Sequence, residues 1–175
     1  VTTLDNRLAA TMEPRAASPQ RRLETIRRLA DAGIETSVMV APVIPGLTDH
    51  EIPALLKAAA DAGATGAGWV MLRLPHQNRA LFMDWLKRHV PERAEAVENK
   101  IREMRGGDLY ESTHSVRHRG RGPLAEQIEQ MFRLFAGRYG LAGDRPSLSS
   151  AAFRRPEVAG QGELFRESAG NVTGE

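Results

Sequence analysis

The chain has 175 residues, 41% of them hydrophobic and 26% charged, a composition that is ordinary for a folded soluble protein and does not indicate bulk disorder. A net charge of +2 is too small to indicate a polyanion-binding protein by itself, and the absence of cysteine excludes disulfides and thiolate metal ligands within the chain. No apolar stretch approaches the ~20 residues that span a bilayer, and no secretory signal is present. We therefore expect a cytoplasmic protein without a membrane partner, although a missing N-terminal segment would hide such a signal.

The first predicted elements are the end of a strand, a helix and a second strand. Residues 1–4 (Val-Thr-Thr-Leu) fit a strand already in progress. Ser18 suits an N-cap and precedes a proline at the first helical position, and Gly33 suits the left-handed residue that ends a helix. Residues 37–41 lack polar alternation, which predicts a strand covered on both faces, as in a parallel sheet.

Residues 48–75 repeat this pattern thirty positions later. Thr48 and Glu51 have the spacing of a capping box, which predicts that a second helix begins there. Gly63 suits its end, and residues 69–72 (Trp-Val-Met-Leu) predict the next strand. Because a helix is the usual connection between parallel strands, the repeat predicts an α/β fold with a parallel sheet.

The predicted strands are too few for a closed barrel. An eight-fold (β/α) barrel typically takes ~250 residues, and no strand pattern follows the repeat. The chain also begins with Val1 rather than with methionine. We therefore expect a fragment that holds the later part of a barrel over residues 1–77. The alternative is a complete, small three-stranded α/β domain.

Three further helices are predicted in a C-terminal extension over residues 78–142. Asn78 suits a cap, and Pro91 and Pro123 suit first helical positions. Apolar and aromatic side chains recur along these helices at helical spacing, so we expect them to form core. Over residues 143–175 this periodicity disappears, and Gly, Ser, Pro and Arg dominate, which predicts a disordered tail.

Four segments together resemble a known enzyme family. They have the sequences Thr-Thr-Leu-Asp (2–5), Met-Glu-Pro-Arg-Ala-Ala-Ser-Pro (12–19, followed by Arg22), Ala-Pro-Val-Ile-Pro-Gly-Leu-Thr-Asp (41–49) and Leu-Arg-Leu-Pro (72–75). In this order and spacing they closely resemble the radical S-adenosylmethionine (radical SAM) enzymes, in the branch related to spore photoproduct lyase. The resemblance covers roughly residues 1 to 140. It implies a partial (β/α)6 TIM-type barrel, of which this chain supplies the end of the fourth unit and then the fifth and sixth.

The resemblance also implies a cofactor chemistry. In that family a three-cysteine loop near the first strand holds a [4Fe-4S] cluster, which reductively cleaves S-adenosylmethionine to a 5′-deoxyadenosyl radical. This chain has no cysteine, so the cluster loop would lie upstream. We expect the full-length protein to be a lyase-like enzyme that acts on DNA, and this chain alone to bind no metal and to be inactive.

The same resemblance assigns residues to the S-adenosylmethionine site. Those expected near the ribose or the adenine are Thr2, Thr3, Val43, Ile44, Gly46, Leu72 and Leu74. Pro42 replaces the first glycine of the family's adenine-contacting segment, and Asp49 stands near its acidic position. The resemblance of this segment therefore favours main-chain contacts over side-chain contacts.

Polar residues near the predicted strand ends are candidates for binding substrate, because ligands of barrels and open α/β sheets bind at those ends. Arg73 and His76 follow the last predicted strand. Arg15 offers a guanidinium fork that suits a carboxylate or a phosphate. For Arg15 the alternative is a salt bridge with Glu13 or Asp5.

Residues 114–121 form a basic loop whose arginines would contact DNA phosphates in a salt-dependent manner. These arginines are Arg117, Arg119 and Arg121. His114 and His118 have a spacing that suits a shared metal on a helix, but the surrounding glycines disfavour a helix and we expect no metal site. A solvated loop without a ligand is the alternative.

The tail contains a peptide that resembles the Gln-x-x-Leu-Phe motif by which bacterial DNA polymerases and repair proteins dock on the sliding clamp. Its anchor residues are Gln161, Leu164 and Phe165. An amide and two adjacent apolar side chains on a flexible tether suit such docking. With the basic loop, this peptide supports an alternative function, a non-catalytic DNA-associated binding module.

Overall fold

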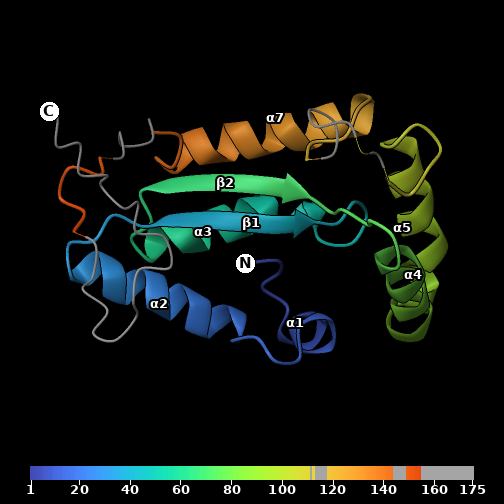
Figure 1. Ribbon diagram of the computed structural model, residues 1–175, viewed down its shortest axis with the longest axis horizontal. Helices are drawn as coiled ribbons and strands as arrows, with labels where there is room; N and C mark the ends of the chain where they lie inside the picture. The colour runs from blue at the N-terminus through green and yellow to red at the C-terminus, as the bar shows by residue number, and fades with distance from the viewer. Residues whose placement is uncertain (111, 113–117, 144–148, 155–175) are drawn as a thin grey trace, which may run out of the picture. The chain divides into compact units, whose positions relative to one another are not determined.

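The computed structural model describes residues 1–110, 112, 118–143 and 149–154 (Figure 1). The chain divides into two compact units, Val1–Arg145 and Pro146–Glu175. The described part of the second unit, 149–154, is exposed and contains a turn in which the Phe153 N–H donates to the Ser150 carbonyl at 2.9 Å. All candidate residues discussed below as described belong to the first unit.

The first unit combines helices with a small parallel sheet. Its helices are α1 (Asn6–Met12), α2 (Pro19–Asp31), the 3-10 helix η1 (Asp49–Glu51), α3 (Ile52–Asp61), α4 (Asn78–His89), α5 (Pro91–Glu103) and α7 (Pro123–Arg138). Strands β1 (Ser37–Val43) and β2 (Gly66–Met71) pair in parallel. The predicted α/β class and parallel pairing are confirmed. The described residues form two strands and do not form a barrel.

The first copy of the repeat folds as its capping signals predict. The Ser18 hydroxyl accepts a hydrogen bond from the Arg21 N–H at 3.3 Å, and Pro19 opens α2. Gly33 follows the helix with a φ of 72°, in the left-handed region. The predicted starts of α5 and α7 at Pro91 and Pro123 are also confirmed. Helix α4 begins at the predicted place, but Asn78 is its first residue and not its cap, which is Gln77 without a side-chain hydrogen bond.

The second copy begins differently, and the predicted capping box is wrong. The Thr48 hydroxyl accepts a hydrogen bond from the Ile44 N–H at 3.0 Å and closes the loop after β1. The Glu51 carboxylate accepts hydrogen bonds from the Thr3 hydroxyl at 2.6 Å and from the Leu4 N–H at 2.7 Å. Because both side chains bond to other segments, neither caps α3, and η1 leads into that helix.

The N-terminal residues lie beside β1 but do not form a regular strand. The Val1 nitrogen donates to the Met39 carbonyl at 2.6 Å, and the Thr2 hydroxyl donates to the Ala41 carbonyl at 2.9 Å. Of these two bonds, only the first joins main chain to main chain. The segment therefore lies where the strand was predicted. A side-chain hydrogen bond from Thr2 takes the place of the second main-chain bond that a strand would form.

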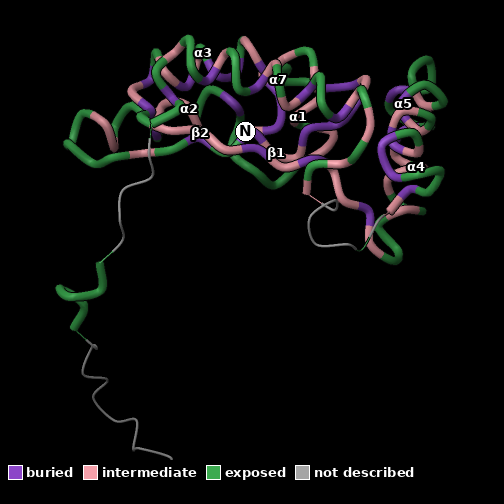
Figure 2. The backbone as a smooth tube through the Cα atoms, turned by 90° about the horizontal axis from the view of Figure 1, so that it is seen from above, coloured by how far each residue is buried: buried purple, intermediate pink, exposed green. Residues whose placement is uncertain are grey.

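The two faces of the sheet differ in what covers them. One face contributes Val38, Val40, Trp69 and Met71 to the main hydrophobic core. Helices α3 and α7 lie together on this side of the sheet in Figure 2. On the other face Met39 is 50% exposed. The prediction that the strands are covered on both faces is wrong for the described residues, because no described helix covers Met39.

A second hydrophobic cluster lies at the carboxyl ends of the strands. It joins Ile44 and Leu74 from the strand ends to Leu86 of α4 and Val97 of α5. The Trp85 indole N–H also donates to the Thr11 carbonyl at 3.0 Å and ties α4 to the end of α1. The helical extension thus closes over the edge of the sheet at which the ligand site was predicted.

Candidate functional site

The carboxyl ends of β1 and β2 bring the two predicted adenine-contacting segments together. Val43 pairs with Met71, and the Leu72 N–H donates to the Val43 carbonyl at 2.9 Å. The segments meet because the two strands are parallel and end at the same level. The proximity of the two segments therefore follows from the observed register.

The loop after β1 is closed on itself and covered. The Ile44 carbonyl accepts hydrogen bonds from the N–H groups of Leu47 at 3.0 Å and Thr48 at 2.9 Å. Gly46 has a φ of 78°, and a Cβ built on it would lie 3.0 Å from the Lys100 Cδ. A ligand that approaches the Gly46 backbone must therefore displace the Lys100 side chain of α5.

The apolar residues assigned to the adenine are mostly core. Val43, Ile44 and Leu74 are 1%, 0% and 2% exposed, while Leu72 is half-buried. Three of these four side chains therefore pack inside the protein. Of the four, the side chain of Leu72 is the one that a ligand can reach, because the main-chain groups of Val43, Ile44 and Leu72 already bond within the chain.

The hydroxyls assigned to the ribose are engaged within the chain. Thr2 and Thr3 are 3% and 1% exposed. Thr2 bonds to the Ala41 carbonyl, and Thr3 bonds to Glu51 and accepts from the Asp5 N–H at 3.0 Å. Glu51 thus holds the N-terminal segment against η1, a role that the sequence analysis missed because the spacing to Thr48 suggested a local cap.

Arg15 and His76 are both exposed. The alternative for Arg15, a salt bridge with Glu13 or Asp5, is wrong, because Glu13 pairs with Arg22 at 2.9 Å and the Asp5 carboxylate caps the start of α1. Arg15 forms no ion pair within the described residues. His76 has a φ of 46°, a backbone conformation that non-glycine residues seldom adopt and that occurs preferentially near functional sites.

Two arginines converge on the end of β2. The Nε of half-buried Arg73 is itself buried and has no hydrogen-bond partner in the described structure. Arg105 is 4% exposed, and its Nη2 donates to the Leu72 carbonyl at 2.9 Å. Sequence analysis missed Arg105 because it stands alone before a glycine pair, without a motif around it. The Nε of Arg73 thus differs from Arg105 in that it is buried at the strand end without a hydrogen bond.

A pocket of about 570 Å³ opens between α1, η1 and the junction of α4 with α5, with Leu47 of the loop after β1 in its lining. Its volume lies within the ~300–1,000 Å³ of small-molecule sites. Its lining is mixed in charge and includes Asp5, Arg7, His50, Glu51, Arg88 and Arg93. The described residues contain no cluster of three or more His, Cys, Asp or Glu side chains arranged to hold a metal ion.

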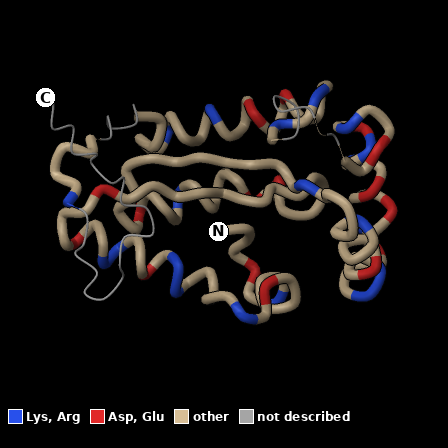
Figure 3. Tube along the Cα trace, in the orientation of Figure 1, with Lys and Arg blue, Asp and Glu red and all other residues tan. Residues whose placement is uncertain are grey.

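The described arginines of the basic loop are exposed, Arg119 beside Trp69 of β2 and Arg121 beside the end of α5. Arg119 places its guanidinium carbon 4.5 Å from the centre of the Trp69 ring, and the Arg121 N–H donates to the Met104 carbonyl at 3.1 Å. Figure 3 shows the charged residues on helices and loops, with none on the two strands. Outside the described residues lie Arg117, His114, Gln161, Leu164 and Phe165.

Comparisons with known proteins give relatives without an assigned function. Over 148 residues the chain is 36% identical to the uncharacterized proteins Mb2609c of Mycobacterium bovis and Rv2578c of Mycobacterium tuberculosis, a match of 82% of this chain and 39% of each relative. The uncharacterized protein ORF301 of Acidianus two-tailed virus is 26% identical over 126 residues, 69% of this chain and 40% of that protein. The chain thus spans about two fifths of the length of these relatives.

No protein-family model matches the chain, and no solved structure matches it. Within the described residues, no helix combines the length and the apolar character that crossing a membrane requires.

Proposed function

We propose that this chain is the C-terminal part of a radical SAM enzyme related to spore photoproduct lyase, and that it supplies the last strand–helix units of a partial (β/α)6 barrel. The order of elements supports this proposal: residues 1–4 beside β1, then α2, β1, α3 and β2, with the strands parallel. The four sequence segments that resemble the family fall at the ends of these strand positions or in the loops that follow them.

The observation that most supports the proposal is that helices cover only one face of the sheet. In a β/α barrel the helices cover the outer face of the sheet, and the inner face meets the opposite strands. Here α3 and α7 cover the Val40 face, while Met39 on the other face is half exposed. An inner barrel face whose opposite strands belong to another part of the protein would have this appearance.

The hydrogen bonds at the sheet edges indicate where further strands would add. At the outer edge of β2 the N–H groups of Ala67 and Met71 already donate to the carbonyls of Leu141 at 3.1 Å and His118 at 2.9 Å. The other edge, along β1, is occupied by the N-terminal segment. We therefore propose that β2 is the last strand and that any further strands of a barrel would pair beyond the N-terminal segment.

The residues present do not fit the iron–sulfur cluster, because the chain has no cysteine. We propose that the cluster is held by another part of the protein, and we derive no step of its chemistry from this chain. For S-adenosylmethionine, which in this family is the source of the 5′-deoxyadenosyl radical, the accessible contact at these strand ends is the side chain of half-buried Leu72. The role proposed for Arg73 is to hold an anionic group of the substrate at the end of β2.

Anaerobic reconstitution of the full-length protein with iron and sulfide tests the function. With a reductant and S-adenosylmethionine, we expect 5′-deoxyadenosine in the full-length protein and none from the 175 residues alone. A full-length protein that acquires no cluster absorbance and forms no 5′-deoxyadenosine would overturn the assignment.

For the substrate we propose DNA, contacted through the exposed guanidinium groups of Arg119 and Arg121. Replacing both by alanine should weaken binding to a DNA duplex and reduce the slope of log affinity against log salt by about 2, because two phosphate contacts are lost. An unchanged slope would remove these residues from the DNA contact. The alternative function, a binding module without catalysis, predicts DNA affinity without 5′-deoxyadenosine.

A further inference from the structure

The outer edge of β2 has one unpaired position between two paired ones. Alternate residues of a strand direct their N–H and C=O groups to the same edge. Ala67 and Met71 use this edge to bond Leu141 and His118. Trp69 lies midway between them, and its main-chain N–H and C=O face the same edge. Neither group has a hydrogen-bond partner in the described part of the chain. An unpaired main-chain group of this kind favours a bound partner, since burial without one costs free energy.

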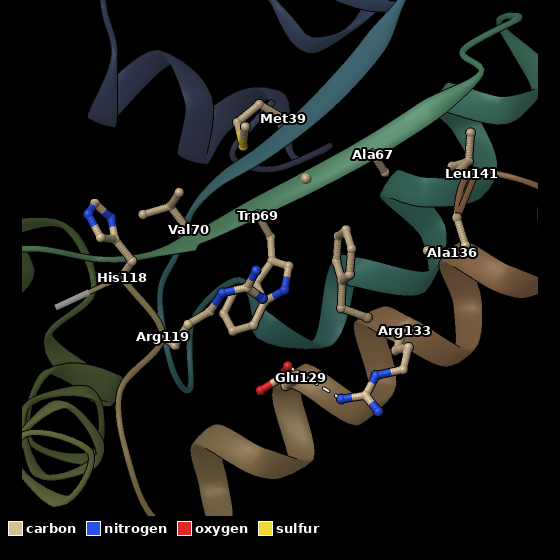
Figure 4. Close-up of a pocket in the computed structure, with 13 residues that line it drawn as sticks. Met39, Ala67, Trp69, Val70, His118, Arg119, Glu129, Arg133, Ala136 and Leu141 are labelled. Atoms are coloured by element: carbon tan, nitrogen blue, oxygen red, sulfur yellow. Dashed lines mark hydrogen bonds and ion pairs between the residues drawn. The ribbon is translucent and has the colours of Figure 1, made fainter. Parts of the chain in front are cut away.

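A pocket of about 420 Å³ opens at this position. Figure 4 shows Met39 and Val70 on one side of the strand and Trp69 and Arg119 on the other, with Arg133 of α7 facing the same space. Trp69 is 4% exposed and lines this pocket, so a ligand in the pocket would lie against the edge of β2 at the Trp69 main chain. Its volume suits a small molecule.

The paired positions on either side exclude an added peptide strand. A strand that paired with Trp69 would also have to pair with Ala67 and Met71, whose N–H groups are taken. The site therefore offers one donor and one acceptor, side by side. A planar group with an adjacent acceptor and donor matches this pair, and the pairing edge of a nucleobase has that arrangement.

The charged residues around the pocket favour an anionic ligand. The Arg119 guanidinium lies over the Trp69 ring, and Arg133 is 74% exposed, with its Nη2 3.3 Å from the Glu129 carboxylate. Glu129 offsets one positive charge, so the guanidinium groups retain a net positive charge at the mouth. Guanidinium groups bind phosphate oxygens through paired, charge-assisted hydrogen bonds.

We propose that this pocket binds a nucleobase that carries a phosphate, with the base on the main chain of Trp69 and the phosphate on Arg119 and Arg133. The ligand is either a free mononucleotide or one nucleotide of a single-stranded nucleic acid. The inference does not rest on the proposed enzyme, because the pocket lies at the edge of β2 and not at the carboxyl ends of the strands.

Titration calorimetry with cytidine monophosphate (CMP) and the intact protein tests this proposal. Cytosine carries an amino donor beside a ring-nitrogen acceptor, and it avoids the adenine site of the proposed enzyme. Ala142→Trp places a large side chain at the rim, where Ala142 is exposed, and should weaken CMP binding at least about tenfold, the effect of losing both main-chain hydrogen bonds.

Two arginine variants separate the phosphate contact from a general effect of charge. Arg133→Ala should weaken CMP binding about tenfold, the effect expected for a lost hydrogen bond to a charged group, and should leave cytidine binding unchanged. Arg138→Ala is the matched control on α7, because Arg138 is exposed and does not line the pocket. Melting temperatures show whether each variant is folded. If Ala142→Trp does not fold, the comparison of Arg133→Ala with Arg138→Ala alone tests the proposal.

Further ligands complete the test. Ribose 5-phosphate should bind at least about tenfold more weakly than CMP because it cannot bond to the Trp69 main chain. If a five-nucleotide oligo(dC) binds more tightly than CMP, the natural ligand is a single-stranded nucleic acid. If CMP binds more tightly than oligo(dC), the natural ligand is a free nucleotide. Excess S-adenosylmethionine should not displace CMP. The proposal is overturned if neither CMP nor oligo(dC) binds, if S-adenosylmethionine displaces CMP, or if binding is the same in Arg133→Ala and Arg138→Ala.

Discussion

The two faces of the β1–β2 sheet are built from alternate residues of the same strands, yet only one of them is core. Met71 is 2% exposed and packs in the cluster beneath α3 and α7, whereas Met39 is 50% exposed. Both lie in apolar runs, and the runs alone did not distinguish them. The difference shows that helices of this chain cover one face, while Met39 on the other face stays half exposed among the described residues.

Matched methionine substitutions measure this difference directly. Met71→Ala should lower the free energy of unfolding by about 2–5 kcal/mol, because it leaves a cavity in the core. Met39→Ala should change it by less than about 0.5 kcal/mol, since the side chain is largely solvated. Urea denaturation of the 175-residue chain measures both. Equal losses in the two variants would contradict the proposed asymmetry.

The contact between the N-terminal segment and η1 predicts the next largest effect. Glu51→Ala removes the acceptor of the Thr3 hydroxyl and the Leu4 N–H, and should destabilise the chain by about 1.5–3 kcal/mol. Glu92→Ala is the control, because Glu92 is an exposed residue of the neighbouring pocket lining. If the control loses as much stability in the same denaturation experiment, the Glu51 contacts do not hold the segment.

The two glycines that end the repeated helices give a smaller, sharper comparison. Both have positive φ, 72° at Gly33 and 93° at Gly63, so alanine is strained at each. A Cβ at Gly63 would also lie 2.6 Å from the Ala30 Cβ, whereas one at Gly33 meets nothing within 4 Å. Gly63→Ala should therefore cost about 1–3 kcal/mol more than Gly33→Ala in thermal or urea unfolding. Equal costs would show that α2 can shift away from Gly63.

The parts of the fold that could be predicted from the sequence are those set by local signals. Ser18 caps α2, and Pro91 and Pro123 begin their helices, because a cap or a fixed φ acts on the residues next to it. The thirty-residue repeat also predicted the parallel pairing of β1 with β2, because one strand–helix unit of about that length connects parallel strands. Helix α1 was missed because it is short and contains no buried residue.

The parts of the candidate site that could not be predicted depend on contacts between distant segments. Glu51 bonds to Thr3 across 48 positions, and Arg105 bonds to Leu72 across 33. The unpaired main chain of Trp69 becomes visible only when Leu141 and His118 are seen to pair on either side of it. Spacing along the sequence contains none of this information.

Oxidation of Met39 tests most directly whether the open face is the inner face of a larger barrel. Peroxide converts exposed methionine to its sulfoxide, and mass spectrometry of peptides gives the rate for each residue. We predict that Met39 is oxidised at least about tenfold faster in the isolated 175-residue chain than in the full-length protein, while Met71 is slow in both. Equal Met39 rates in the two proteins would contradict the account, because the open face would then remain open in the whole molecule.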